Sequence, residues 1–514
     1  MTFILALTPI LIILILMVGL RWSAARAGAA GYLSALVIAI LFFGAGTNLL
    51  AYAHAKAWFL SADVLLIIWA AFLLYRVTDE AGAIRIIGKS LPHLTPDSGM
   101  QALIIGWVFA TFLQGVGGFG VPVAVISPIL VGLGFPPLSA VLIPSIGHGW
   151  AVTFGSLGSS FTALMASTGM SANELAPPAA FFLGIAGIFT GPFVAFAVGG
   201  WKTARRLLLP ALLIGLLMAS VQFVVATNGF WYIGSFVAGI FGLAIGMPIA
   251  TRTRNGGKTV GSIDVRALLL SLSGYALLIV ITLCIQLIPA VKNALGSVSI
   301  QMQFPETSTS LGHVTPAGPG RNIPIFRHTG MILLYTSVLA YFVFRMAGRY
   351  KEGALSNILS GTVKRVMSSS VSIASMVAMA VIMQHAGMTD TIARGLANVV
   401  GALYPIIAPW IGALGAFMTG SNTNSNVVFG GLQKCTAELL GYSVPIILAA
   451  QTAGAALASV MAPTKVVVGA STAGMVGKEG DVMRKLFVYV GLLIALISVL
   501  TVIAVIVSER AAGA

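Results

Sequence analysis

The chain has 514 residues, of which 58% are hydrophobic and only 8% are charged, and its mean hydropathy is +1.01. Soluble domains carry roughly 25% charged residues, so this composition excludes a sizeable soluble domain and predicts an all-α polytopic membrane protein. The net charge of +15 does not indicate nucleic-acid binding, because the basic residues are spread over short loops instead of forming one patch.

The first predicted element is an apolar segment at residues 3–20, followed by Arg21 and Arg26. A cleaved signal peptide has its positive charges first and ends at a small-residue site, so we expect this segment to be retained as a membrane helix. Since a spanning helix needs roughly 20 apolar residues, the sequence predicts about 12 transmembrane helices. Their ranges are 3–20, 31–52, 58–76, 138–170, 177–200, 207–226, 231–250, 266–289, 328–346, 367–386, 443–475 and 486–507.

Two further apolar segments, 100–133 and 402–438, are interrupted in the middle by Gly and small polar residues. The interruptions are Gln114-Gly-Val-Gly-Gly-Phe-Gly120 and Thr419-Gly-Ser-Asn-Thr-Asn-Ser-Asn426, and we expect each half to be too short to cross a membrane alone. Lipid tolerates irregular backbone only where protein buries it or where it lines a polar cavity. We therefore predict two re-entrant hairpins whose tips meet at a substrate site.

The spans 138–170 and 443–475 are too long for one straight crossing, and each contains a helix breaker. The breakers are Gly155-Ser-Leu-Gly-Ser-Ser160 and Met461-Ala-Pro-Thr-Lys465. We predict two broken helices beside the hairpin tips. Half-helix N-termini offer free N–H groups and a positive dipole end to a carboxylate, whereas Ser, Thr and Asn side chains suit cations or hydroxyls.

The distribution of basic residues predicts the orientation of the chain. With the N-terminus outside, the inner side holds 20 of the 28 Lys and Arg residues, the outer side holds 7, and Lys465 remains within the membrane. This excess follows the positive-inside rule. The same orientation predicts an inverted repeat, in which residues 1–200 start outside, residues 201–265 form linker helices, and residues 266–514 start inside.

Three polar segments lie outside the predicted spans. Residues 78–91 and 389–398 precede the two hairpins, and both could form amphipathic helices at the membrane surface. Residues 290–327 are rich in Gly, Pro, Ser and Thr and are predicted to lie outside, where they form either a lid or a plain loop.

The expected substrate-binding residues come from both tips and both breaks. They are Gln114, Gly115, Gly117, Gly118, Gly155, Ser156, Ser159, Ser160, Ser421, Asn422, Thr423, Asn424 and Lys465. Six consecutive polar residues, 421–426, could instead form an exposed extracellular turn, but apolar flanks on both sides argue against it. Lys465 sits in an apolar span, where an ionisable residue is a functional hypothesis by default; its alternative is snorkelling to the inner face.

Proton coupling has two candidates, His148 and Lys465. His148 lies a turn or two before the first break, where it either packs with a hydrogen bond or carries a proton, because a histidine titrates near neutral pH. Burial can bring a lysine toward neutrality as well. The sequence shows no metal cluster, paired carboxylates or catalytic triad, so we expect no enzyme activity, metal or cofactor, and we expect Cys284 and Cys435 only to pack.

At these residues the chain resembles the lactate permease family of bacteria. The resemblance spans roughly residues 1 to 510 and rests on Gly117-Gly-Phe-Gly-Val-Pro-Val-Ala124, Val131-Gly-Leu-Gly-Phe135, the second tip, Met461-Ala-Pro463 and Gly474-Met-Val-Gly-Lys-Glu-Gly480. It implies a secondary transporter of the bacterial plasma (inner) membrane that imports L-lactate, D-lactate or glycolate with protons. The family is grouped with an ion transporter superfamily whose known members have inverted repeats, re-entrant hairpins and elevator motion.

The resemblance also implies specific roles and differences. Dicarboxylate carriers of the superfamily place Ser-Asn-Thr at hairpin tips, as in Ser421-Asn-Thr423. The family commonly has an acidic residue at Gln114, Asp at Asn422 and a neutral residue at Lys465, so this chain moves the site toward positive charge.

Three functions therefore remain open from the sequence. They are a proton-coupled importer of a small hydroxycarboxylate, a carrier or exchanger of another organic anion such as a dicarboxylate or a sulfonate, and an anion channel. The broken helices favour a carrier. The expected partners are the anion, protons or another coupling ion, and the lipid bilayer, and a homodimer stays open.

Overall fold

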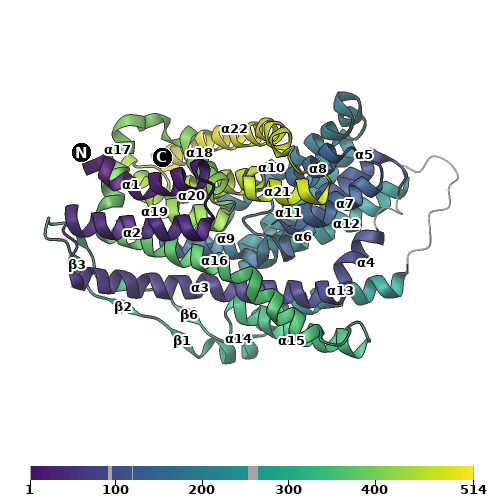
Figure 1. Cartoon of the computed structure of the whole chain (residues 1–514), viewed down its shortest axis with the longest axis horizontal. Helices are drawn as coiled ribbons and strands as arrows, with labels where there is room; N and C mark the ends of the chain where they lie inside the picture. Colours follow the sequence, from purple (N-terminus) through teal and green to yellow (C-terminus); the bar gives the residue numbers. More distant parts are fainter. Residues whose placement is uncertain (1, 91–94, 119, 253–263, 513–514) are drawn as a thin grey trace.

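The computed structural model describes residues 2–90, 95–118, 120–252 and 264–512, and the statements below refer to these ranges. Phe119 of the first tip and the predicted inner-loop residues Arg254 and Lys258 lie outside them. In the described chain, 12 helices or continuous helical runs are long and apolar enough to cross a membrane. The predicted polytopic all-α fold is therefore confirmed (Figure 1).

The first half of the chain is helical apart from short connections. Its elements are α1 (Thr2–Leu14), η1 (Ile15–Gly19), α2 (Ala24–Phe42), α3 (Thr47–Glu80), α4 (Ala83–Ser90), α5 (Ser98–Gln101), η3 (Ala102–Phe109), α6 (Ala110–Val116), α7 (Val121–Gly132), α8 (Pro137–Gly149), η4 (Ser156–Gly158), α9 (Ser159–Thr168), α10 (Ala172–Arg206), α11 (Leu208–Val225), η5 (Ala226–Phe230), η6 (Trp231–Ile233) and α12 (Gly234–Arg252).

The second half is also mainly helical, with one irregular insertion. Its helices are α13 (Val265–Leu287), α14 (Pro289–Gly296), α15 (Thr329–Met346), α16 (Ala354–His385), α17 (Met388–Val400), η7 (Gly401–Leu403), α18 (Tyr404–Thr419), α19 (Asn422–Leu440), α20 (Val444–Ala458), η8 (Ser459–Met461), α21 (Pro463–Thr472) and α22 (Glu479–Ala512). Its strands are β1 (Ser299–Ile300), β2 (Gln303–Phe304), β3 (Thr307–Ser308), β4 (Val314–Thr315), β5 (Gly318–Pro319) and β6 (Ile323–Pro324).

The connection between the second and third helices differs from the prediction. A loop between spans 31–52 and 58–76 would contain Lys56, but α2 already ends at Phe42 and α3 runs unbroken through Lys56. The predicted loop is wrong because every second residue of Ala51-Tyr-Ala-His-Ala-Lys-Ala57 is Ala, the best helix former. The turn occurs instead at Gly44, whose φ of +67° suits glycine.

A pair of helices joined by a short connection lies at each of the two predicted hairpin positions. Helix α6 ends at Val116 and α7 begins at Val121, residues 420–421 join α18 to α19, and the two helices of each pair contact one another. The continuous run Ser98–Val116 has 19 residues and is 94% buried. By length it could cross a membrane, so the expectation that each half is too short is wrong for this arm, which is surrounded by protein.

The two long spans are each divided into shorter helices. Residues 150–158 separate α8 from α9, and residues 459–462 separate α20 from α21. In the second break Ala462 has the extended φ and ψ of −60° and 138°, as expected for the residue before Pro463, because proline disfavours helical backbone at the preceding position. Each break therefore creates a new helix N-terminus inside the molecule.

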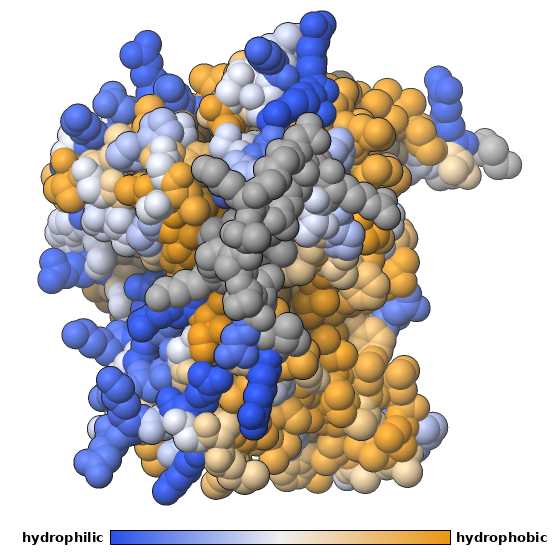
Figure 2. Space-filling view, turned by 90° about the vertical axis from the view of Figure 1, so that its right-hand side faces the viewer, coloured by the Kyte–Doolittle hydropathy of each residue, from blue (hydrophilic) through white to orange (hydrophobic). Residues whose placement is uncertain are grey.

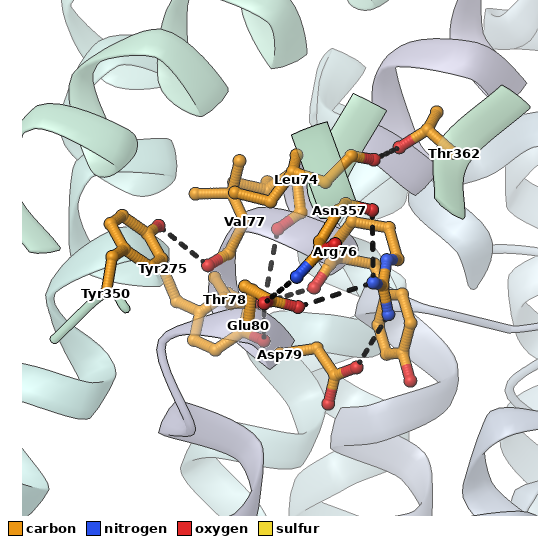
Figure 3. A network of polar contacts seen from close by, with 12 residues as sticks. Leu74, Arg76, Val77, Thr78, Asp79, Glu80, Tyr275, Tyr350, Asn357 and Thr362 are labelled. Atoms are coloured by element: carbon orange, nitrogen blue, oxygen red, sulfur yellow. Dashed lines mark hydrogen bonds and ion pairs between the residues drawn. The ribbon is translucent and has the colours of Figure 1, made fainter. Parts of the chain in front are cut away.

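Two of the long helices, α3 and α16, pack side by side along the long axis of the molecule (Figure 1). A polar network joins them near the end of α3 (Figure 3). Arg76 contacts Glu80 at 3.4 Å and donates to the carbonyl of Asn357 at 3.3 Å, and Asn357 Nδ2 donates to Glu80 at 3.1 Å. Tyr350 donates to the carbonyl of Val77 at 2.9 Å. These bonds fix the start of α16 against α3.

The insertion between α14 and α15 contains three nested antiparallel strand pairs, β1–β6, β2–β5 and β3–β4. We call residues 299–324 the outer hairpin. It runs beside α3 in Figure 1, and near its tip the amide of Ser310 donates to the carbonyl of Gly44 at 2.9 Å. The region predicted as a lid or a plain loop is thus an ordered, irregular hairpin.

The surface agrees with a membrane setting. Figure 2 shows the end of the molecule that lies at the right of Figure 1, with hydrophilic side chains on the left and upper parts and a hydrophobic flank on the right. On α11, Leu209, Leu213 and Leu216 are each more than half exposed. Such surface is unfavourable in water and suited to lipid.

Candidate functional site

Four half-helices begin close to one another in the structure. They are α7 and α19, which follow the hairpin tips, and α9 and α21, which follow the breaks. Each helix N-terminus has N–H groups without intrahelical partners and carries the positive end of the helix dipole. Four N-termini in one place would therefore favour a bound anion.

Contacts connect these N-termini in a ring. Gly118, just before α7, lies so close to Ser156 that a Cβ built on this glycine would be 1.6 Å from Ser156 Oγ. A Cβ on Gly420 would be 2.5 Å from Thr464 Oγ1 in α21. Ser160 of α9 and Thr423 of α19 share a hydrogen bond of 3.0 Å. Helices α21 and α7 also contact each other, which closes the ring.

Lys465 lies at the first turn of α21 and is only 7% exposed. Its Nζ donates to Ser459 Oγ at 3.0 Å, and its stem lies about 4.0 Å from the Cβ position of Gly120. Among the described residues no carboxylate lies within 4.0 Å of Nζ. An ammonium buried without a negative partner is costly, so a bound anion would stabilise it.

The second tip is held by a network of neutral polar groups. Asn422 Nδ2 donates to Thr153 Oγ1 at 3.0 Å, and Asn426 Nδ2 donates to Thr452 Oγ1 at 2.9 Å. Ser421 caps α19 by accepting from the amide of residue 424 at 3.2 Å. The Oδ1 atoms of Asn422 and Asn426 have no hydrogen-bond partner among the described residues. The tip is therefore buried and ordered, which contradicts the alternative of an exposed extracellular turn.

The first break contains strained backbone. Ser156 and Leu157 are consecutive non-glycine residues with φ of 48° and 53°, in the left-handed region that β-carbon contacts disfavour. Such outliers cost on the order of 1–3 kcal/mol each and cluster at functional sites. Gln114 faces this break, with Nε2 3.5 Å from Ser156 Oγ. The carbonyl oxygen of the Gln114 side chain has no partner among the described residues.

His148 lies at the end of α8 and is fully buried. Its Nδ1 lies 2.6 Å from the carbonyl of Pro144, while Nε2 has no partner in the described chain. Since a carbonyl only accepts, Nδ1 carries the hydrogen and Nε2 is left with a lone pair. Helix α8 contacts both η8, which holds Ser459, and α21, which holds Lys465. The two proton-coupling candidates are therefore carried by helices that contact each other.

A cavity of about 260 Å³ lies beside Lys465. We call it the inner cavity, after the predicted orientation. Its polar wall includes Lys465, Ser421, Asn424, Ser372 and Arg365. Drug-sized ligands need roughly 300–1,000 Å³, so this cavity suits a small anion.

A second cavity, of about 550 Å³, lies farther along the same two helices, α16 and α19. We call it the outer cavity. On α19 the inner cavity reaches Asn424 and the outer cavity starts at Val427. At the point between them, Asn424 Nδ2 donates to Ser372 Oγ of α16 at 2.9 Å. The cavities thus lie end to end along a seam where α3 and α16 face α9 and α19, with a polar contact between them.

Not all the expected site residues face this region. Gly115 lies within α6, where a Cβ would meet the backbone of Phe236 at 2.5 Å, so it allows close packing against α12. Gly117 lies against the ring of Tyr75. Gly155 packs against the carbonyl of Gln114. Ser159 is buried at the start of α9, and its Oγ has no partner among the described residues.

Sequence reasoning missed several polar residues of the site. Ser372, Thr153, Thr452 and Ser459 all bond to the tips or to Lys465. Ser372 ends the run Ser368-Ser-Ser-Val-Ser372 inside a predicted apolar span, and that run was a detectable signal. Thr153 and Thr452 carry no such signal, because isolated threonines are common in membrane helices.

Comparisons with known proteins agree with this architecture. The family model for L-lactate permease matches residues 2–508. Glycolate permease GlcA of Escherichia coli (strain K12) is 27% identical over 93% of this chain and 91% of its own. L-lactate permeases of Bacillus subtilis (strain 168) and Streptococcus iniae are 27% and 31% identical, over 96% and 76% of this chain and 94% and 80% of theirs.

A solved structure shares the fold. The YdaH transporter of Alcanivorax borkumensis aligns with 89% of this chain and 87% of its own, at a TM-score of 0.51 and 14% identity. The family match, the permease names of the relatives and the 12 apolar helices of the described chain together identify a multi-pass membrane transporter, not an enzyme. The chain belongs to the L-lactate permease family. Its relatives named above are bacterial proteins, which agrees with the predicted location in a bacterial inner membrane.

Proposed function

We propose that this protein is a secondary active transporter that imports L-lactate or a related small hydroxycarboxylate, such as D-lactate or glycolate, by proton symport. The observation that carries this proposal is the ammonium of Lys465, buried where four helix N-termini converge and without a carboxylate partner among the described residues. The names of the relatives, L-lactate permease and glycolate permease, support a 2-hydroxy monocarboxylate as substrate.

The site offers groups for both ends of such a molecule. Lys465 and the amides at the start of α7, α9, α19 and α21 would hold the carboxylate. Neutral groups beside them, such as Ser421 and Asn424, would hydrogen-bond the hydroxyl. On binding, Asn424 would give up its hydrogen bond to Ser372 and donate to the substrate instead. Substrate binding would thus loosen the contact of α19 with α16 that separates the two cavities.

Alternating access would then occur along the seam. In the proposed elevator motion, the hairpins and half-helices move as one body past α3 and α16. The network of Arg76, Glu80 and Asn357 joins α3 to α16, as a fixed wall requires. Inverted repeats and re-entrant hairpins are part of the same proposal.

The proposed function is tested by uptake of radiolabelled L-lactate into proteoliposomes. We expect saturable uptake that accelerates when the interior is made alkaline, and competition by unlabelled glycolate. Flux that rises linearly without saturation would support an anion channel instead. Saturable uptake that is indifferent to the proton gradient would replace symport with exchange or another coupling ion.

A second candidate is a carrier of a dianion or a sulfonate. It is favoured by one observation, that Arg365 lines the same cavity as Lys465 and adds a second positive charge. Strong competition by a dicarboxylate or a sulfonate, with weak competition by glycolate, would favour this candidate.

Alanine substitution of Ser421, Asn422 or Thr423 is expected to raise the apparent KM for L-lactate. Each substitution removes a hydrogen bond at the second tip, and one such bond contributes on the order of 1 kcal/mol, or about fivefold in affinity. Ser471→Ala, an exposed position in α21, is the matched control and should leave KM unchanged. Unaltered KM in all three tip variants would place the second tip outside the site.

A further inference from the structure

The outer cavity is lined by basic side chains from three separate elements. Lys56 comes from α3, Lys434 from α19 and Arg321 from the outer hairpin. All three are partly exposed. We propose that this cavity is a second binding site for a small carboxylate, which loads the anion before it reaches Lys465. Since the ligand class is that of the proposed function, the outer site rests on that proposal.

Lys56 carries the least compensated charge in this cavity. Its Nζ lies 3.5 Å from Nε2 of His385 and 6.0 Å from the ring centroid of Phe304. Because an ammonium only donates, Nε2 accepts, and Nδ1 of His385 donates to Thr307 at 3.3 Å. His385 is therefore neutral in this arrangement. In the described chain no carboxylate lies within 4.0 Å of Lys56.

Lys434 adds a second positive charge close to the first. Its Nζ donates to the carbonyl of Thr168 at 3.0 Å, and Glu438 reaches it only at 4.0 Å with more than half of its side chain exposed. Glu174 is also exposed, and among the described residues it forms no ion pair with Lys434 within 4.0 Å. Lys434 and Lys56 line the same cavity, where two like charges repel each other. An anion between them would relieve that repulsion.

Arg321 is already paired and serves to shape the cavity. It forms an ion pair with buried Asp63 at 2.9 Å, and Asp63 is also bonded to His328 at 2.8 Å. Asp63 is thus paired with Arg321 and His328, and it does not neutralise Lys56 or Lys434. The pair also fixes the outer hairpin against α3, which makes this hairpin a wall of the site.

The rest of the wall is apolar and matches a small organic anion. Phe59 and Leu60 of α3, together with Trp231 and Phe304, face the same space. A short hydrocarbon body could lie against these side chains while its carboxylate faces the lysines. The seam then leads toward the contact of Asn424 with Ser372 and the inner cavity.

The test measures binding of radiolabelled L-lactate to the purified full-length protein in low-salt detergent solution. The Lys465→Met variant removes the central site, so any remaining binding reports the outer one. We expect it to keep a weak, salt-sensitive site, and we expect Lys465→Met combined with Lys56→Met to lose about tenfold more affinity. Lys465→Met combined with Lys56→Arg, which keeps the charge, should bind like the single variant and controls for misfolding.

Uptake measurements separate the two sites. Lys56→Met alone should raise KM about five- to tenfold at low salt with little change in maximal rate, because loss of an outer charge slows capture of the anion. Lys292→Met, exposed and outside the cavity, should behave as wild type. Absence of binding in Lys465→Met, or an unchanged KM in Lys56→Met, would overturn the outer site. Absence of L-lactate uptake by the wild type would overturn the proposed function and the outer site with it.

Discussion

Replacing Lys465 with Met is expected to reduce L-lactate uptake by about 100-fold or more while leaving insertion intact. Removing the positive partner of a buried charge pair costs about 2–5 kcal/mol, much of it from the charge left unpaired, and each 1.4 kcal/mol is tenfold. Of the described residues that line the inner cavity, Arg365 would then be the one basic side chain left for the substrate carboxylate. Met has a similar unbranched shape, so packing against Gly120 should survive.

Two companion variants make the Lys465 result specific. Lys478→Met removes an exposed lysine that follows the same helix and should transport at the wild-type rate. Lys465→Arg keeps the charge but changes its shape, so partial activity is expected. Wild-type uptake by Lys465→Met would mean that the ammonium only snorkels and that the anion is held elsewhere.

The sequence predicted the elements of the site better than their contacts. Both tips and both breaks are visible because Gly, Pro and small polar residues interrupt long apolar runs, and lipid does not tolerate such interruptions without a reason. Lys465 is visible because a lone ammonium stands out in the same background. These are local signals, and each can be recognised within about ten residues.

The contacts between elements could not be predicted in the same way. Asn422 bonds to Thr153 and Asn424 bonds to Ser372, across 269 and 52 residues of chain. Nothing in the spacing of a single threonine or serine reveals such a partner. Two-residue strands likewise lack the alternation that marks longer strands, so the sequence of the outer hairpin does not distinguish a lid from a plain loop.

The error at Lys56 shows how one boundary changes a site. Residues 51–57 mix Ala with aromatic and basic residues, and their low hydropathy suggested a loop at the membrane surface. High helix propensity instead extended α3 to 34 residues. Lys56 is consequently held on a rigid helix facing the outer cavity, and a lysine in a mobile loop could not form the site proposed there.

Uptake of L-lactate is expected to rise as the outside pH falls from about 8 to about 5.5, and His148→Gln should flatten this dependence more than it lowers the maximal rate. A carboxylic acid of pKa ~4 stays ionised over this range, so the change should come from the protein. His148 has a free lone pair on Nε2 among the described residues, and its helix α8 contacts α21, which carries Lys465.

The expected coupling follows from the charges of these two groups. With the site empty, the positive charge of Lys465 opposes protonation of His148. A bound carboxylate offsets that charge and so lowers the free-energy cost of protonating His148. By linkage, the proton then favours binding of the anion to the same extent, which is the requirement for symport. Gln at position 148 can still donate to the carbonyl of Pro144 but cannot be protonated. The His148→Gln variant therefore tests the effect of protonation separately from that of the hydrogen bond. If His148→Gln keeps the wild-type pH profile, the proton is carried by Lys465 or another group, and if wild-type uptake does not change with pH, proton symport is excluded.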